Sequence, residues 1–286
     1  MIEKDLPEPE GKRVTVGPHT VHYIDLGDGP PTVFLHGGGP GCSGWTDFGT
    51  VADAFAGDRQ VLLLDMLHFG RSSKEPIRAP RWSYHAQVIA GALEAIGVTE
   101  ADFVCNSVGG SAALALAAER PDLVRRLVLT GSEPTPRGAV PPTEELGRKG
   151  ATAYGTYYDE EGPTPEKLLA IMAELEWHDP AGIPRWTFDL RWELSRDPDL
   201  LALGPDWSAA GGRGIPQDLA AHLGAVRAPT LLLWGERDAF LVPDYALGLT
   251  RLMPDASLHV MADGAHHMEE ERPEEYTAIV KAFLDA

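Results

Sequence analysis

Short apolar runs alternate along the chain with segments in which apolar residues recur at helical spacing. Residues 14–24 alternate apolar and polar positions, which predicts an antiparallel hairpin near the start of the chain. Continuous apolar runs separated by helices are typical of a mostly parallel sheet covered on both faces. The pattern therefore predicts an α/β fold with a doubly wound sheet. The runs predicted as strands are residues 33–35, 61–65, 103–105, 127–130, 230–234 and 257–261.

Helical periodicity marks three further segments. Apolar residues recur at helical spacing within residues 88–96, and Gly97 is a stop signal. Residues 112–119 are strong helix formers ended by Pro121. Residues 276–284 carry the apolar stripe of an amphipathic helix that closes the chain.

The alternation of strands and helices is interrupted between residues 133 and 216. This segment opens with a proline-rich connector and then has a helical pattern without a strand-like run. We therefore predict a core at residues 1–132 and 217–286, interrupted by a helical cap at residues 133–216. The tryptophans of the cap either pack its own small core or form the roof of a pocket above the sheet. The connector prolines are residues 134, 136, 141 and 142, and the tryptophans are residues 177, 186, 192 and 207.

A sharp turn between a strand and a helix is predicted at Asn106-Ser107-Val108-Gly109-Gly110. Such a turn exposes a serine hydroxyl above the sheet, and the small residue two positions later lets the backbone pass closely. We interpret Ser107 as a nucleophile; the alternative is an ordinary turn serine. Cys105 stands where the G-x-S-x-G pattern has its first glycine.

An acid and a base follow later in the chain, each just beyond a predicted strand. Asp238 lies in the loop after residues 231–234, and His266 with His267 follows Met261. The order serine, acid, histidine is the one this type of turn requires. A serine needs a base to take its proton, and the base needs a carboxylate to orient it. We predict His266 as the base and Asp238 as its partner, with His267 as a competing base and a surface loop aspartate as the alternative for Asp238.

A glycine-rich loop at residues 36–41 follows the first of the predicted parallel strands. Its glycines let backbone N–H groups approach a substrate oxygen, and together with the Val108 amide the loop can form an oxyanion hole. A phosphate cradle is the alternative, but the lysine of a P-loop is absent.

The chain resembles the meta-cleavage product hydrolases, serine-dependent C–C bond hydrolases of aromatic catabolism with the α/β-hydrolase fold. The resemblance rests on HGGGPG at 36–41 followed by Gly44-Trp45, on the Asn-Ser-x-Gly-Gly turn, and on Arg191-Trp192-Glu193. It implies a 2-hydroxy-6-oxo-dienoate substrate that is ketonised and then cleaved by water. It also implies that Gly38 and Val108 supply the oxyanion amides, that Asn106 polarises the substrate oxygens, and that a homodimer forms.

Arg191 is the predicted clamp for a substrate carboxylate, because a guanidinium binds a planar carboxylate through two hydrogen bonds. The alternative is a surface arginine paired with Glu193 or Asp189. The full set of predicted substrate-binding residues is Gly37, Gly39, Asp47, Asn106, Arg191, Trp192 and His267.

The sequence departs from the family pattern at several positions. Asp47 replaces an asparagine, His267 a tryptophan, Cys105 a glycine, and Leu67-His68 a Pro-Gly turn. If Asp47 faces the pocket, its carboxylate would repel a dianionic dienoate or act as an acid or base. A second imidazole at His267 would make the pocket titratable near neutral pH.

The chain has a formal net charge of −19, which opposes binding to nucleic acid or anionic lipid. An acidic substrate would therefore need a basic group inside the pocket. No apolar stretch is long enough to span a membrane, and we expect a cytoplasmic protein with Cys42 and Cys105 as free thiols. We expect no metal and no organic cofactor.

These observations predict a serine-dependent hydrolase of a small molecule that cleaves a C–C bond in a vinylogous 1,5-diketone. One rival is an esterase or lactonase that uses the same residues, since they serve any acyl transfer. The other rival is a non-hydrolytic or ligand-binding member of the fold.

Overall fold

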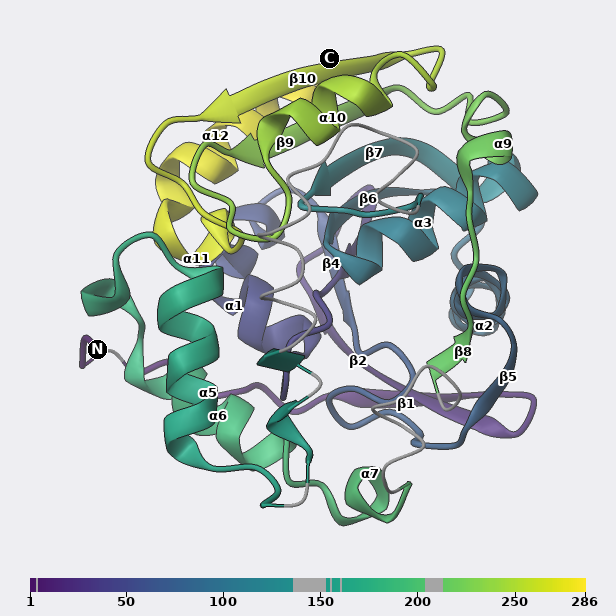
Figure 1. Cartoon of the computed structure of the whole chain (residues 1–286). Coiled ribbons are helices and arrows are strands. Elements are labelled where there is room, and N and C mark those ends of the chain that lie inside the picture. Colours follow the sequence, from purple (N-terminus) through teal and green to yellow (C-terminus); the bar gives the residue numbers. More distant parts are fainter. Residues whose placement is uncertain (4, 136–152, 155, 160, 204–212) are drawn as a thin grey trace.

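A twisted eight-stranded sheet runs through the computed structural model (Figure 1), which describes residues 1–286 except 4, 136–152, 155, 160 and 204–212. The strand order is β1-β2-β4-β3-β6-β7-β9-β10. β1 pairs antiparallel with β2, and β2 antiparallel with β4, whereas all later neighbours are parallel. The strands are β1 Lys12–Val16, β2 His19–Leu26, β3 Pro31–Leu35, β4 Gln60–Leu64, β6 Ala101–Asn106, β7 Val124–Thr130, β9 Thr230–Gly235 and β10 Ala256–Met261.

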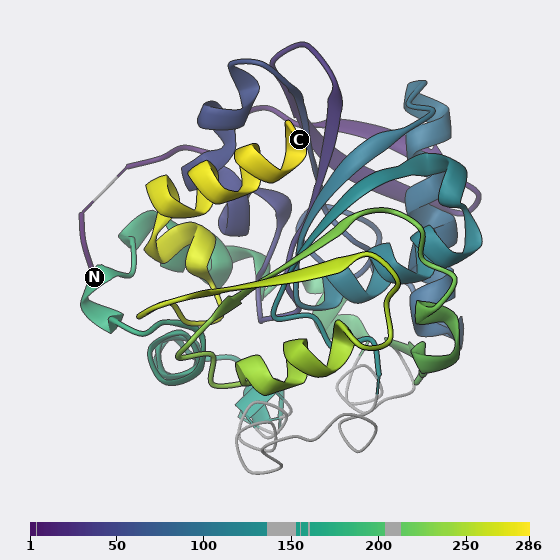
Figure 2. The same cartoon turned by 90° about the horizontal axis from the view of Figure 1, so that it is seen from above.

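Helices cover both faces of this sheet (Figure 2). α1 and α12 pack on one face against residues such as Phe34 and Val104, and α2, α3 and α10 pack on the other against Val33 and Phe103. Successive strand residues point to opposite faces, and both faces are buried, so the strands are continuous apolar runs. The helices of the core are α1 Gly44–Ala56, α2 Arg81–Ile96, α3 Val108–Glu119, η1 Pro121–Leu123, α9 Ala220–Leu223, α10 Pro243–Leu249, α11 Met268–Glu271 and α12 Pro273–Leu284.

The predicted strands and helices are confirmed, with ends that differ by up to seven residues: the helix predicted within residues 88–96 begins at Arg81. Gly97 ends α2 in the left-handed region at φ 84°, as its stop signal predicts. A second, two-stranded sheet was not predicted. It pairs β5 (Ile77–Pro80) with β8 (Arg213–Ile215), so the expectation of no strand within residues 133–216 is wrong. β8 has three residues and a central glycine, so it lacks any apolar alternation and depends on its distant partner.

The described part of residues 133–216 otherwise consists of short helices joined by loops. Trp177 packs in a small cluster of the segment's own, while Trp186 packs against the core near Trp45, with ring centres 6.4 Å apart. Trp207 and three of the connector prolines lie outside the described residues, and the boundaries of the cap stay a prediction. The helices here are α5 Pro165–Ile171, η2 Met172–Glu176, η3 Pro180–Gly182, α6 Arg185–Leu194 and α7 Pro198–Ala202.

Parallel strands end at a common edge, and the loops that follow them meet there. The loop after β3, the turn after β6 and the loops after β7, β9 and β10 therefore gather at one place. Within the described residues, no helix is both long and apolar enough to span a bilayer.

Candidate active site

Ser107 sits on a strained turn between β6 and α3. Its backbone has φ 52° and ψ −116°, a left-handed conformation that a non-glycine residue adopts only at a cost of about 1–3 kcal/mol. The turn packs so tightly that a Cβ on Gly109 would lie 2.3 Å from the Leu35 carbonyl oxygen. A Cβ on Gly110 would lie 1.9 Å from Ser132 Oγ. The glycines after Ser107 are therefore a steric requirement of the turn.

His266 and Asp238 form a buried pair at the same edge of the sheet. His266 Nδ1 lies 2.9 Å from Asp238 Oδ2, and Asp238 Oδ1 accepts the amides of Phe240 and Leu241 at 2.8 and 2.9 Å. The carboxylate is thus fixed by the backbone and in turn fixes the imidazole, whose Nε2 remains for the serine. Gly131, at φ 54°, leaves no space for a side chain beside the ring: a Cβ there would lie 2.4 Å from His266 Cε1.

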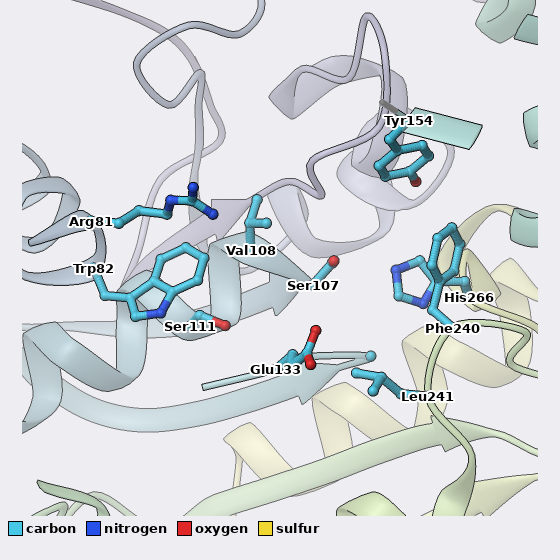
Figure 3. Close-up of a pocket in the computed structure, with 11 residues that line it drawn as sticks. Arg81, Trp82, Ser107, Val108, Ser111, Glu133, Tyr154, Phe240, Leu241 and His266 are labelled. Carbon is cyan, nitrogen blue, oxygen red and sulfur yellow. The ribbon is translucent and has the colours of Figure 1, made fainter. Parts of the chain in front are cut away.

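A cavity of about 260 Å³ contains both Ser107 and His266. Figure 3 shows the Ser107 hydroxyl pointing toward the imidazole of His266. The arrangement can therefore transfer the serine proton to the imidazole as the oxygen attacks a bound carbonyl. The cavity is lined by Arg81, Trp82, Ser107, Val108, Ser111, Gly131, Glu133, Tyr154, Phe240, Leu241 and His266.

The glycine loop lies against the start of α3. A Cβ on Gly38 would lie 2.9 Å from Val108 Cγ1, so the two residues predicted to supply the oxyanion amides are in contact. The Gly37 amide is already used, because it donates to Asp47 Oδ2 at 2.7 Å. Gly39 packs on Arg191, whose Nη2 would lie 2.5 Å from a Cβ at that position.

Asp47 lies in the first turn of α1, beneath the glycine loop, and is fully buried. It accepts the Gly37 amide and the Thr46 hydroxyl, and it is not among the residues that line the cavity. The structure thus gives Asp47 the role of holding the loop in shape.

Asn106 ties the serine turn to the histidine loop. Its Nδ2 donates to the His266 carbonyl and to Glu269 Oε1, both at 2.9 Å. The side chain is fully buried and does not line the cavity. It therefore lies behind Ser107 rather than beside a substrate.

Arg191 is fully buried and has an internal carboxylate partner. Its Nη1 and Nη2 donate to Glu176 Oε2 and Oε1 at 2.5 and 3.1 Å, and its Nε donates to the Pro40 carbonyl. Burial raises the pKa of Glu176, but Arg191 and His267 outweigh that effect, and the pKa falls to about 2. The alternative of a surface arginine paired with Glu193 or Asp189 is wrong, and the guanidinium is engaged by Glu176 instead of facing this cavity.

Trp192 and His267 also lie away from the cavity. Trp192 is half-buried, with the Arg196 guanidinium 4.3 Å over its ring. His267 Nδ1 lies 3.4 Å from Glu269 Oε1 and 3.5 Å from Glu270 Oε2. Burial lowers the pKa of His267, but Glu270 and the other surrounding carboxylates raise it to about 10. The surrounding carboxyl groups therefore favour the protonated form of His267.

Three possible metal ligands meet beneath the glycine loop. Ligand atoms of Cys42, Asp47 and His267 lie within 4.8 Å of one another. Burial raises the pKa of the Cys42 thiol well above its usual range, and both oxygens of Asp47 already accept hydrogen bonds. The cluster is thus held together by protein contacts.

The fold and the serine turn define an α/β hydrolase. The chain belongs to the α/β-hydrolase fold family, whose sequence pattern matches residues 30–273. A 2-hydroxy-6-oxononadienedioate/2-hydroxy-6-oxononatrienedioate hydrolase of Burkholderia vietnamiensis is 34% identical, over 92% of this chain and 90% of the relative. The corresponding hydrolase 2 of Pseudomonas putida is 32% identical, over 92% and 91%. The solved structure of a 2-hydroxy-6-oxo-6-phenylhexa-2,4-dienoate hydrolase from a Rhodococcus species superposes with a TM-score of 0.82 at 24% identity, over 98% of this chain and 99% of that one.

Proposed function

We propose that this protein is a serine-dependent hydrolase that cleaves a C–C bond in a 2-hydroxy-6-oxo-dienoate. The observation that carries the proposal is the meeting of Ser107 with the buried His266–Asp238 pair in one cavity. The dienoate class is supported by relatives at 32–34% identity that carry this activity in their names. The cytoplasmic location and the homodimer predicted above belong to the same proposal.

The geometry suggests how the residues divide the work. After ketonisation of the dienol, His266 takes the proton of Ser107, or of a water that Ser107 positions, as the oxygen attacks the 6-oxo carbon. The oxyanion forms beside the Gly38 and Val108 amides. The adjacent C–C bond then breaks, its electron pair is delocalised through the leaving fragment onto the 2-oxo oxygen as a dienolate, and the imidazolium returns its proton to that fragment. Where serine is the nucleophile, water hydrolyses the acyl-enzyme by the same proton transfers.

Ester or lactone hydrolysis is a second candidate, and one observation favours it. The arginine that the family resemblance assigns to the substrate carboxylate is already neutralised by Glu176. A substrate without the dienoate carboxylate would need no such clamp.

A paired assay separates the two candidates. The purified protein is offered a chromogenic 2-hydroxy-6-oxo-dienoate and, separately, short-chain p-nitrophenyl esters. Rapid loss of the dienoate chromophore that depends on Ser107 supports C–C cleavage. Rapid ester turnover with an inert dienoate supports the second candidate.

Labelling with a fluorophosphonate probe tests the hydrolytic proposal itself. Folded protein with an activated serine should be labelled, and the Ser107→Ala variant should not. A folded parent protein that stays unlabelled would favour a non-hydrolytic role for the fold.

A further inference from the structure

Arg81 and Trp82 form one end of the active-site cavity. In Figure 3 they lie on one side of Ser107, while His266 and Phe240 lie on the other. Both residues are held in place by backbone contacts: Arg81 Nε donates to the Arg213 carbonyl at 2.9 Å, and the Trp82 indole donates to the Gln217 carbonyl at 3.1 Å. The Arg81 guanidinium carbon also lies 5.4 Å from the centre of the Trp82 ring. The cation is thus fixed in orientation beside the nucleophile.

The charge of Arg81 has no acidic counterpart in the described part of the chain. Burial lowers its pKa, and no carboxylate there raises it. Arg191 differs, because it is paired with Glu176 and both side chains are completely buried. In the described part of a chain with 43 acidic and only 24 basic side chains, this arginine at the active site has no carboxylate partner. Leaving a partly buried cation uncompensated is unfavourable unless an anion binds there.

A second arginine, Arg213, is a neighbour of Arg81. The backbone carbonyl of Arg213 accepts the hydrogen bond from Arg81 Nε. Burial, together with the charge of Arg81, lowers the pKa of Arg213 to about 10.

Glu133 is the one acidic residue among those that line the cavity (Figure 3). Arg81 is the one arginine or lysine among them, so a substrate carboxylate is favoured next to Arg81.

We propose that Arg81 binds a carboxylate of the substrate, so that the enzyme prefers acyl compounds whose acyl chain ends in a carboxylate. Ser107 lies between this anchor and His266, so an anchored chain presents its carbonyl to the nucleophile. This inference rests on the proposed function, because it takes the cavity to be the site of acyl chemistry. Arg81 would thus bind a carboxylate on the acyl half of the substrate, whereas the sequence suggested Arg191 as the clamp for the carboxylate of the dienoate half.

Two esters of matched length test the preference. Mono-p-nitrophenyl glutarate ends in a carboxylate, and p-nitrophenyl valerate has the same chain with a neutral end. Arg81→Met should lower kcat/KM for the glutarate ester by about 10- to 100-fold, the range for losing a charge-assisted hydrogen bond, and leave the valerate ester nearly unchanged. Arg81→Lys should recover part of the loss. Arg78→Met, which removes an exposed arginine of β5, is the matched control and should change neither ester. Equal losses on both esters, or no loss on the glutarate ester, would overturn the proposal.

A binding measurement separates this inference from the proposed function. Glutarate is titrated into the Ser107→Ala protein while the melting temperature is followed. Glutarate should raise the Tm of Ser107→Ala and of Ser107→Ala/Arg78→Met, and have little effect on Ser107→Ala/Arg81→Met. If neither ester is hydrolysed but glutarate shifts the Tm values in this way, the acyl chemistry is rejected and the anion site is retained. Equal glutarate effects on all three proteins, or none on any, would reject the anion site.

Discussion

Glu176→Gln removes the partner of a buried arginine and should destabilise the protein strongly. The carboxylate binds both Nη atoms of Arg191 and accepts the Tyr154 hydroxyl at 2.8 Å. Glutamine keeps the size of the side chain but leaves the Arg191 cation without its closest counter-charge.

Two independent routes give the size of the effect. Breaking a buried ion pair by removing one partner costs about 3–5 kcal/mol. The pKa of Glu176 falls from its ordinary 4.5 to about 2, which corresponds to roughly 3 kcal/mol at neutral pH. We therefore expect the free energy of unfolding at pH 7 to fall by about 3 kcal/mol.

The assay is urea unfolding at pH 7, followed by tryptophan fluorescence and far-ultraviolet circular dichroism. Glu174→Gln, an exposed site in the same helical turn, is the control and should change stability by less than about 0.5 kcal/mol. The double variant Glu176→Gln/Arg191→Met should recover much of the loss, since no buried cation remains. A Glu176→Gln protein within about 1 kcal/mol of the parent would refute the reasoning. The pKa of Glu176 is lower in the folded protein than in the unfolded chain. The stabilisation by Glu176 is therefore present above about pH 4.5 and is lost as the pH falls toward 2.

Three further predictions concern the triad, the buried acidic cluster and the space beside the imidazole. Asp238→Asn should lower kcat on the order of 10⁴-fold with an unchanged circular dichroism spectrum, because the imidazole loses its orienting carboxylate; a fall of under tenfold would remove Asp238 from the mechanism. Burial raises the pKa of Glu269 to about 8 and of Glu270 to about 7, and the folded protein therefore holds protons that the unfolded chain releases. The contribution of these two glutamates to stability is complete below about pH 4.5 and decreases as the pH rises through 8. The double variant Glu269→Gln/Glu270→Gln should therefore flatten the fall in Tm between about pH 5 and 8. An unchanged slope of Tm against pH contradicts this. Gly131→Ala should reduce activity and destabilise the protein by about 1–3 kcal/mol, because its methyl group would overlap His266, whereas Gly57→Ala, with open space around it, should be neutral in both measurements.

The parts of the fold that the sequence predicts are those encoded by local patterns. β6 and β9 are continuous apolar runs because both faces of the sheet are covered, and each is recognisable without its neighbours. The turn at Ser107 is predictable for a similar reason: Gly109 and Gly110 have no space for a side chain, so the local sequence carries the steric constraint.

The partners of buried charges could not be predicted in this way. Arg191 and Glu176 are 15 residues apart, and only the packing of η2 against the glycine loop brings the carboxylate to the guanidinium. Arg81 carries no motif either, because it reaches the cavity through the position of α2 and its contact with β8. Such pairings depend on distances between elements, which hydrophobic periodicity does not specify.

The backbone carbonyl of Glu176 accepts the amides of both His266 and His267, at 3.1 and 3.2 Å. The segment that holds residue 176 therefore cannot move away from the sheet without breaking two hydrogen bonds to the loop that carries the general base. Displacement of that segment and loss of the imidazole's resting position are thermodynamically linked. A mutation on the distant side of η2 can thereby change turnover without touching any atom that meets the substrate.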